Sequence, residues 1–284
     1  MTKYKESIMK AIFFAAACTS ILAVALICLF LFINGIPAMT KIGIFDFLMG
    51  TTWKPNNTPP SFGILPMILG SIYVTAGAAV VGVPVGVLTA VFMAKYCPKK
   101  LYRILKPAIN LLAGIPSIVY GFFGLVVIVP FIRDTFGGAG SSMLAASILL
   151  GIMILPTIVG ISESAIRAIP QSYYEGALAL GASHERSIFF VILPAAKSGI
   201  MAAIVLGIGR AIGETMAVIM VAGNQARMPA GLLKGVRTLT ANIIIEMGYA
   251  AELHREALIA TGVVLFVFIL IINLLLSLLK RRTG

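Results

Sequence analysis

Six long apolar segments dominate this chain and constrain its fold more than any other feature. Each has about 20 residues or more with few charges, the length that an α-helix needs to cross the hydrocarbon core of a bilayer. Because a segment in lipid must satisfy its own backbone hydrogen bonds, each is predicted to be a transmembrane helix. The expected spans are residues 11–33, 65–94, 107–132, 142–161, 199–221 and 257–279.

The composition agrees with a membrane protein and excludes a soluble domain. Hydrophobic residues make up 60% of the chain, charged residues 11%, and the mean hydropathy is +1.04. A net charge of +12 would suit nucleic-acid binding, but the basic residues lie beside the apolar segments, so membrane topology explains them better. We therefore expect contact with a lipid bilayer and no nucleic acid. Cys18, Cys28 and Cys97 have neither metal-site nor disulfide-framework spacing.

The charge distribution predicts how the chain crosses the membrane. Lys and Arg are about twice as frequent in the segments expected inside as in those expected outside, which places both termini in the cytoplasm. Residues 1–64 are expected to form the first span and an outer loop, with Trp53 as an interfacial anchor. Residues 65–280 form the other spans, including an inner loop at 163–197, and residues 281–284 a cytoplasmic tail. A second outer segment, 222–256, has a marginal helical pattern near residues 243–253.

Small residues and prolines mark the spans. Gly70, Gly77, Gly82 and Gly86 would let the second span pack closely against a neighbour. In the third span, AGIPSIVYGFFG (113–124) contains Pro116. Proline has no N–H, so it leaves a carbonyl group of the preceding turn without its helical hydrogen bond. This favours either a broken helix that exposes backbone groups to a substrate path or a plain proline kink.

Arg210 and Glu214 lie four residues apart in the fifth span, so on one continuous helix they share a face. Each alone would cost about 2.5–3.5 kcal/mol near the helix centre, so neither should face lipid. They form either a structural salt bridge or an anion path in which Arg210 meets the substrate and Glu214 orients it. Ser117 and Thr157 are further candidates for the path.

Several functional classes have no support in the sequence. No catalytic set appears, since His184 and His254 are expected on opposite sides of the membrane. No pattern G-x-x-x-x-G-K-[ST] occurs, so ATP binding through a P-loop is not expected, and neither is a metal or a cofactor. Energy for transport would have to come from a partner or an ion gradient.

The inner loop contains the most specific motif, residues 170–194, PQSYYEGALALGASHERSIFFVILP. We expect a helix–turn–helix outside the membrane, with Gly181 supplying the turn. The spacing resembles the EAA loop of type I ABC-transporter permeases, with Gly176 in place of the first alanine and Val191 in place of isoleucine. The resemblance implies a coupling surface for an ATPase subunit at Glu175, Gly176, Ala177, Gly181, Leu193 and Pro194.

Four further stretches resemble the PstC-type permeases of bacterial phosphate ABC transporters. They are residues 47–71, 113–124, 207–218 and 237–248. The resemblance implies a six-helix type I permease in the bacterial inner membrane that carries inorganic phosphate. It also implies a second, PstA-like permease, two PstB-like ATPase subunits and a PstS-like phosphate-binding protein, for which residues 35–64 and 223–256 are candidate contacts.

Two alternatives remain open at this point. A permease for molybdate or sulfate would share the fold and the coupling loop and differ in substrate. An ion-driven carrier or channel would work without an ATPase and would leave the spacing from Glu175 to Pro194 unexplained. A purely structural membrane subunit would not need Arg210 and Glu214 in an apolar span.

Overall fold

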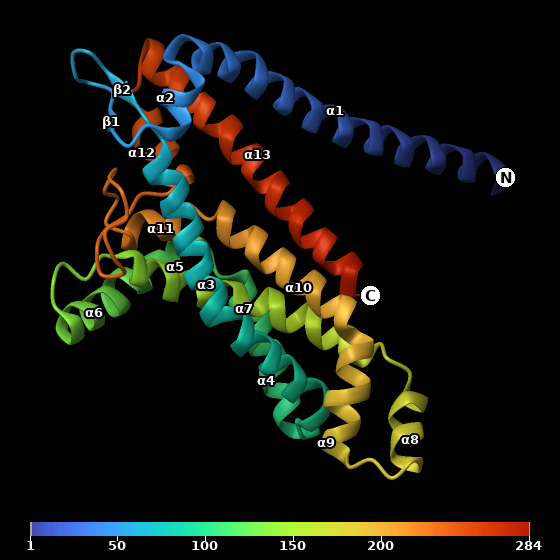
Figure 1. Cartoon of the computed structure of the whole chain (residues 1–284). Coiled ribbons are helices and arrows are strands. Elements are labelled where there is room, and N and C mark those ends of the chain that lie inside the picture. The colour runs from blue at the N-terminus through green and yellow to red at the C-terminus, as the bar shows by residue number, and fades with distance from the viewer. Residues whose placement is uncertain (1, 284) are drawn as a thin grey trace.

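The computed structural model describes the backbone of residues 2–283 and the side chains of residues 6–275 and 278. Within that part of the chain, six helical segments are long and apolar enough to cross a membrane, which confirms the predicted all-α architecture (Figure 1). They are Glu6–Ile42, Leu65–Tyr96, Ser117–Phe136, Met143–Arg167, His184–Gly213 and Glu252–Leu275. The terminal cations that support the predicted topology, Lys3, Lys5, Lys280, Arg281 and Arg282, have side chains outside the described set.

The elements follow one another as helices interrupted by one small hairpin. The N-terminal part comprises α1 (Thr2–Ile42), α2 (Ile44–Met49), β1 (Trp53–Lys54), β2 (Ser61–Phe62), α3 (Leu65–Val91) and the π-helical turn η1 (Phe92–Tyr96). The central part comprises α4 (Lys99–Gly114), α5 (Ser117–Phe123), the π-helical turn η2 (Gly124–Ile128), α6 (Val129–Phe136) and α7 (Met143–Arg167). The C-terminal part comprises α8 (Gln171–Ala179), α9 (His184–Ser187), the π-helical turn η3 (Ile188–Ile192), α10 (Leu193–Gly213), α11 (Met216–Val221), α12 (Leu239–Met247) and α13 (Glu252–Thr283).

Helix α7 is the centre of the bundle and packs against α3 and α10 (Figure 1). Leu149, Ile154 and Ile158 of α7 are buried in the apolar core. A Cβ atom on Gly77 of α3 would lie 2.4 Å from Ser147 Oγ, and one on Gly82 would lie 2.7 Å from the Gly151 carbonyl oxygen. Glycine therefore lets the two helices approach closely, as the sequence predicts.

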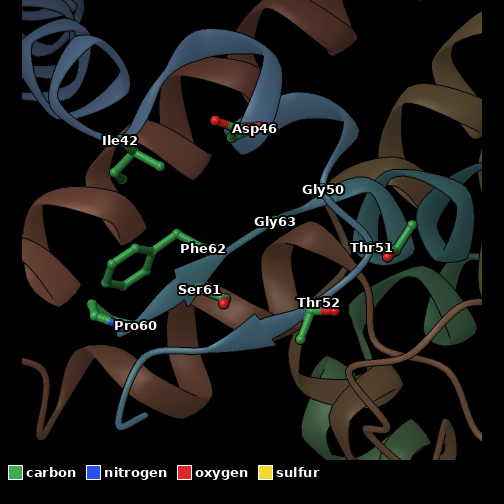
Figure 2. A pocket seen from close by; sticks show the side chains of 9 residues that line it. All are labelled: Ile42, Asp46, Gly50, Thr51, Thr52, Pro60, Ser61, Phe62 and Gly63. Atoms are coloured by element: carbon green, nitrogen blue, oxygen red, sulfur yellow. The ribbon is translucent and has the colours of Figure 1, made fainter. Parts of the chain in front are cut away.

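The predicted outer loop, residues 34–64, is mostly ordered secondary structure. Helix α1 continues to Ile42, α2 follows, and β1 pairs antiparallel with β2, with Trp53 opposite Phe62. Figure 2 shows this hairpin beside α2. Residues of both line a cavity of about 360 Å³. The chain crosses itself at Gly50 and Gly63, where a Cβ on Gly50 would lie 2.7 Å from Gly63 Cα, so neither position has room for a side chain.

Trp53 is not the interfacial anchor that the sequence predicts. Its side chain is only 5% exposed and packs edge-to-face on Phe62. Its indole Nε1–H donates to Glu246 Oε2 at 2.8 Å. The prediction was wrong because a lone Trp in a Gly- and Pro-rich stretch carries no sign of a buried acceptor supplied by α12, almost 200 residues later.

The third span begins later than predicted. Helix α4 ends at Gly114, and Ile115 and Pro116 are extended with ψ of 127° and 141°. Proline has no N–H and disfavours helical backbone at the preceding residue, which accounts for the break. The expected span 107–132 is thus wrong, and a plain proline kink is excluded. The membrane-spanning segment is Ser117–Phe136, and α4 is a separate amphipathic helix that lies against α7.

Other helix ends also differ from the prediction. The fourth span continues to Arg167, and the fifth is continuous with α9 from His184 instead of beginning at residue 199. The expected helix near residues 243–253 is α12 at Leu239–Met247, and α13 starts at Glu252, ahead of the expected residue 257. These shifts move boundaries but leave the order of the six spans unchanged.

Candidate substrate path and coupling surface

The inner loop forms a helix–turn–helix that stands apart from the bundle, as Figure 1 shows for α8 beside α9. Gly181 has φ of +83°, the left-handed backbone that glycine adopts without strain. The Gly181 N–H donates to the Leu178 carbonyl at 2.9 Å, and the Ala182 N–H donates to the Ala177 carbonyl at 3.0 Å. These two bonds form a Schellman motif that ends α8, so the predicted turn at Gly181 is confirmed.

Most of the coupling residues named from the sequence lie at the surface of this loop. Glu175 and Gly176 are exposed on α8, and Ala177 is buried beneath them. The same helix leaves apolar groups uncovered, with Tyr173 54% and Leu180 91% exposed. An exposed helix with an apolar face and close backbone access is suited to contact with another protein.

Leu193 and Pro194 do not close the loop as the sequence suggests. They begin α10 directly after the π-helical turn η3, and Pro194, which has no N–H to donate, lies where the hydrogen-bond pattern changes. The helix continues without interruption from α9 into the span. These two residues therefore lie where the coupling loop enters the membrane, separate from the exposed face of α8.

Two aromatic contacts connect the coupling loop to the end of the second span. The Tyr174 hydroxyl lies 2.7 Å from His184 Nδ1, which joins α8 to α9. The His184 ring packs edge-to-face on Tyr96 of η1, with centroids 5.2 Å apart. His184 therefore contacts both α8 and the turn that follows α3.

Gly181→Ala is expected to weaken coupling, because alanine at φ of +83° costs about 1–2 kcal/mol and the Schellman motif would loosen. The measurement is ATP hydrolysis by the assembled transporter with its binding protein, where we expect a clear fall in stimulated activity. Gly160→Ala is the matched control, since a Cβ there meets nothing within 4 Å and the position is helical within α7, outside the loop. Equal effects of the two substitutions would contradict a role for the turn geometry.

The fifth span is broken at Glu214, which separates Arg210 from it. Helix α10 ends at Gly213, Glu214 is extended with ψ of 134°, and α11 begins at Met216. The Glu214 Oε1 atom accepts hydrogen bonds from the Thr215 N–H at 3.1 Å and the Ala217 N–H at 3.3 Å. Glu214 therefore caps α11, and the expectation that it orients Arg210 was wrong because it assumed one continuous helix.

Arg210 itself is exposed at the end of α10. Within the described residues it forms no ion pair, so the alternative of a structural salt bridge with Glu214 is excluded. A guanidinium group at the end of an apolar helix, with no compensating carboxylate in the described residues, needs water, an anion or a partner subunit. Among the residues of the candidate path, Arg210 is therefore the one whose charge lacks a partner in the described residues.

Both broken helices meet at the same place. Helices α5 and α11, which follow the two breaks, pack against each other, and a Cβ on Gly121 would lie 3.0 Å from Ala217 Cα. The Tyr120 hydroxyl of α5 donates to the Leu112 carbonyl at 2.8 Å and so connects the two sides of the first break. The Thr240 hydroxyl donates to the Glu214 carbonyl at 3.1 Å and so holds the second break from α12.

Ser117 and Thr157 are half-buried on α5 and α7. In the described part of the chain neither hydroxyl forms a hydrogen bond, and no bond joins either residue to Arg210. The structure therefore brings the two broken helices together but does not assemble the four predicted path residues into one contact. Tyr120 and Thr240 were missed, because nothing in their local sequence marks them.

A buried carboxylate, Glu163, forms a cluster that the sequence did not reveal. Its side chain is 1% exposed and accepts bonds from the Tyr102 hydroxyl at 2.7 Å and Arg167 Nε at 2.7 Å, and it pairs with Lys106 Nζ at 2.5 Å. The bond to Glu163 raises the pKa of the Tyr102 hydroxyl above its usual value, so this donor stays protonated. The cluster fastens α4 to α7, and the available signal was Glu163 itself, an acid at the inner end of an apolar span.

A second buried carboxylate, Glu246, organises the end of the molecule that carries the hairpin, which is predicted to lie outside. It accepts bonds from Trp53 Nε1 and Arg237 Nη1, and it contacts His254 Nε2 at 2.8 Å. These residues join the hairpin, the segment before α12, and α13 into one outer cap. The stretch 237–248 that the sequence singled out therefore has a structural role, which is to hold this cap together.

The comparisons with known proteins agree with this fold. Residues 82–284 match the family described as "Binding-protein-dependent transport system inner membrane component". The chain belongs to this family. It is thus a multi-pass inner-membrane permease component of an ABC transport system that works with a binding protein and an ATPase, and it does not itself catalyse a reaction.

Relatives and solved structures match over most of the chain. A "Probable ABC transporter permease protein YqgH" of Bacillus subtilis is 41% identical, covering 93% of this chain and 88% of that protein. A "Phosphate transport system permease protein PstC" of Mesorhizobium japonicum is 33% identical, covering 95% and 89%. A bacterial alginate ABC transporter is similar in structure, with a TM-score of 0.67 at 16% identity and coverage of 95% and 94%. An inward-facing MetNI methionine transporter gives a TM-score of 0.63 at 22% identity, over 78% and 96%.

Proposed function

We propose that this chain is the PstC-like permease subunit of an ATP-driven importer of inorganic phosphate. Relatives that are 31–35% identical over most of the chain are named as phosphate transport permeases, which supports the substrate. The observation that carries the proposal is Arg210, exposed on a broken span without an ion pair in the described residues. A guanidinium group without a carboxylate partner in that position would bind an anion while it is being transported.

Arg210 would meet phosphate through its planar fork of N–H donors. Two parallel hydrogen bonds to a tetrahedral oxyanion are geometrically favourable for a guanidinium group and shorter and stronger than neutral ones. The breaks at Ile115–Pro116 and Glu214 lie beside it and leave backbone groups without helical partners. Irregular backbone at membrane depth is typical of transporter helices that line a path. Ser117 and Thr157 would add hydroxyl donors along this path.

Glu214 offers a route to selectivity for phosphate over sulfate. Its Oε1 atom is held by two backbone N–H groups, so the carboxylate has a fixed orientation. In the described residues Oε2 has no hydrogen-bond partner and could accept a proton from a phosphate oxygen that is still protonated at neutral pH. Sulfate carries no such proton and would meet only the negative charge.

The same proposal assigns partners to the two ends of the molecule. Helix α8, with Glu175, Gly176 and Ala177, would dock on one of two PstB-like ATPase subunits in the cytoplasm, which places both termini inside. A PstA-like permease would complete the path across from Arg210. A PstS-like binding protein would deliver phosphate to the outer cap, where the hairpin and its cavity of about 360 Å³ form the candidate contact.

Competition during uptake tests the substrate. The assembled transporter in proteoliposomes is given its binding protein, ATP and radiolabelled phosphate, with excess unlabelled phosphate, sulfate or molybdate. Unlabelled phosphate should abolish the signal and the other two anions should leave it nearly unchanged. Inhibition by sulfate or molybdate as strong as that by phosphate would assign the permease to another oxyanion.

A further inference from the structure

A second group of cations surrounds a pocket at the end of the bundle that carries the coupling loop. The pocket has a volume of about 360 Å³, within the range of small-ligand sites. It lies where η1 turns into α4, beside the C-terminal end of α7. We call it the basic pocket, and its lining residues are Ala94, Lys95, Cys97, Lys99, Tyr102, Arg103 and Arg167.

Three of the four cations that line the basic pocket have no carboxylate partner in the described residues. Lys95, Lys99 and Arg103 form no ion pair in the described residues, and Lys95 and Arg167 are close enough to repel each other. The nearby carboxylate, Glu163, does not line the pocket and is already bound by Lys106, Tyr102 and Arg167. Three cations without a carboxylate partner around one cavity attract a counter-anion.

The hydrogen-bond donors of the basic pocket that have no partner in the described residues indicate which kind of anion would fit. Arg167 uses Nε for Glu163 and Nη2 for the Met93 carbonyl, which leaves Nη1 without a partner in the described residues. The guanidinium group of Arg167 also lies over the Tyr102 ring, 4.5 Å from its centroid, so its position is fixed. Lys95, Lys99 and Arg103 add further donors, which suits an anion with several oxygen atoms and more than one possible negative charge.

We propose that the basic pocket binds a phosphate group, either as free inorganic phosphate or as the headgroup of an anionic phospholipid. The site is separate from the path at Arg210, and the inference does not depend on which anion is transported. Lys95 also lines a neighbouring cavity with Gln171, Tyr174 and His184, so a bound phosphate group lies against the base of the coupling loop. Occupation of the pocket would therefore stiffen the junction between α3, α4 and α8.

Cys97 provides a direct test because it lines the pocket. The chain has three cysteines, and replacing Cys18 and Cys28 of α1 with alanine leaves Cys97 as its single thiol. The assembled transporter in nanodiscs is labelled with an uncharged maleimide, and the modification of this chain is followed by intact mass. At a ligand concentration ten times the dissociation constant, the free fraction falls to about a tenth, so labelling should slow about tenfold.

Two sets of labelling experiments distinguish free inorganic phosphate from a phospholipid headgroup. In phosphatidylcholine nanodiscs, inorganic phosphate is compared with chloride at equal ionic strength, and slower labelling in phosphate identifies the free ion. In a second set without added phosphate, phosphatidylglycerol replaces part of the phosphatidylcholine, and slower labelling identifies a lipid headgroup. Equal labelling rates under all of these conditions would overturn the proposal.

A pair of variants makes the result specific to the pocket. Lys95→Gln with Arg103→Gln removes two of its cations and should abolish most of the slowing of Cys97 labelling. Lys100→Gln is the matched control, since Lys100 is exposed on the same helix but does not line the pocket. If phosphate still slows the labelling of Cys97 in the double variant, the proposed site is wrong. If the double variant fails to assemble, the labelling rates of the unsubstituted pocket with and without a phosphate group still decide the question.

Discussion

Replacing Arg210 with alanine is expected to lower ATP-dependent phosphate uptake about 10- to 150-fold. Charge-assisted hydrogen bonds contribute about 1.5–3 kcal/mol, and each 1.4 kcal/mol corresponds to roughly a tenfold change in rate or affinity. The folded structure should be little affected, because Arg210 is exposed and forms no ion pair in the described residues. The measurement is initial uptake into proteoliposomes at fixed ATP, with assembly checked by size-exclusion chromatography.

Two controls distinguish an anion contact from a general charge effect. Arg210→Lys retains the charge without the planar fork and should recover only part of the uptake. Arg133→Ala removes an exposed arginine of α6 that pairs with Asp134, away from the two breaks, and should leave uptake unchanged. Normal uptake by a well-assembled Arg210→Ala transporter would remove Arg210 from the proposed path.

The largest effect on stability is expected at the Glu163 cluster. Replacing both Lys106 and Arg167 with methionine would leave a carboxylate that is 1% exposed with only the Tyr102 hydroxyl as a donor. Leaving a buried charge without its partners costs about 3–5 kcal/mol, which corresponds to a fall in melting temperature on the order of 10 °C. The measurement is thermal unfolding of the assembled transporter in detergent.

The same cluster predicts a rescue. Adding Glu163→Met to the double variant removes the unpaired charge, and a buried ion cluster replaced by apolar side chains of similar volume is often as stable as the original. The triple variant should therefore recover most of the lost melting temperature. Lys100→Met with Lys197→Met, two exposed cations, is the control and should shift it little. A triple variant no more stable than the double variant would show that the cluster acts through packing.

The sequence predicts the six spans well because each is a local property of composition and length. Hydropathy over about 20 residues finds a transmembrane helix regardless of its neighbours. The turn at Gly181 was also predictable, because a left-handed residue after a helix has a strong local preference for glycine. The helix–turn–helix of α8 and α9 follows from these two signals, and its role in coupling stays a prediction.

The helix breaks were harder to predict because tertiary contacts decide them. Pro116 could have produced a kink or a full break, and the packing of Gly121 on Ala217 accompanies the break. At Glu214 no proline is present, and the break depends on the carboxylate capping α11 and on Thr240 from α12. A prediction that treats residues 199–221 as one helix therefore pairs Arg210 with Glu214 incorrectly.

The two buried carboxylate clusters were missed for a related reason. Glu163 and Tyr102 are 61 residues apart in sequence, and Glu246 and Trp53 are 193 apart. Charge counting assigned Lys106 and Arg167 to topology, and a lone Trp was assigned to the interface. Their partners are supplied by the packing of α4 on α7 and of α12 on the hairpin, which no local pattern encodes.

The most direct test of the account is phosphate uptake into proteoliposomes with and without the ATPase subunits. The assembled transporter with its binding protein should accumulate phosphate only when ATP is hydrolysed. This chain with its partner permease alone should accumulate none, whatever ion gradient is imposed. Accumulation of phosphate without the ATPase subunits, driven by an ion gradient, would contradict the assignment of this chain as an ATP-coupled permease.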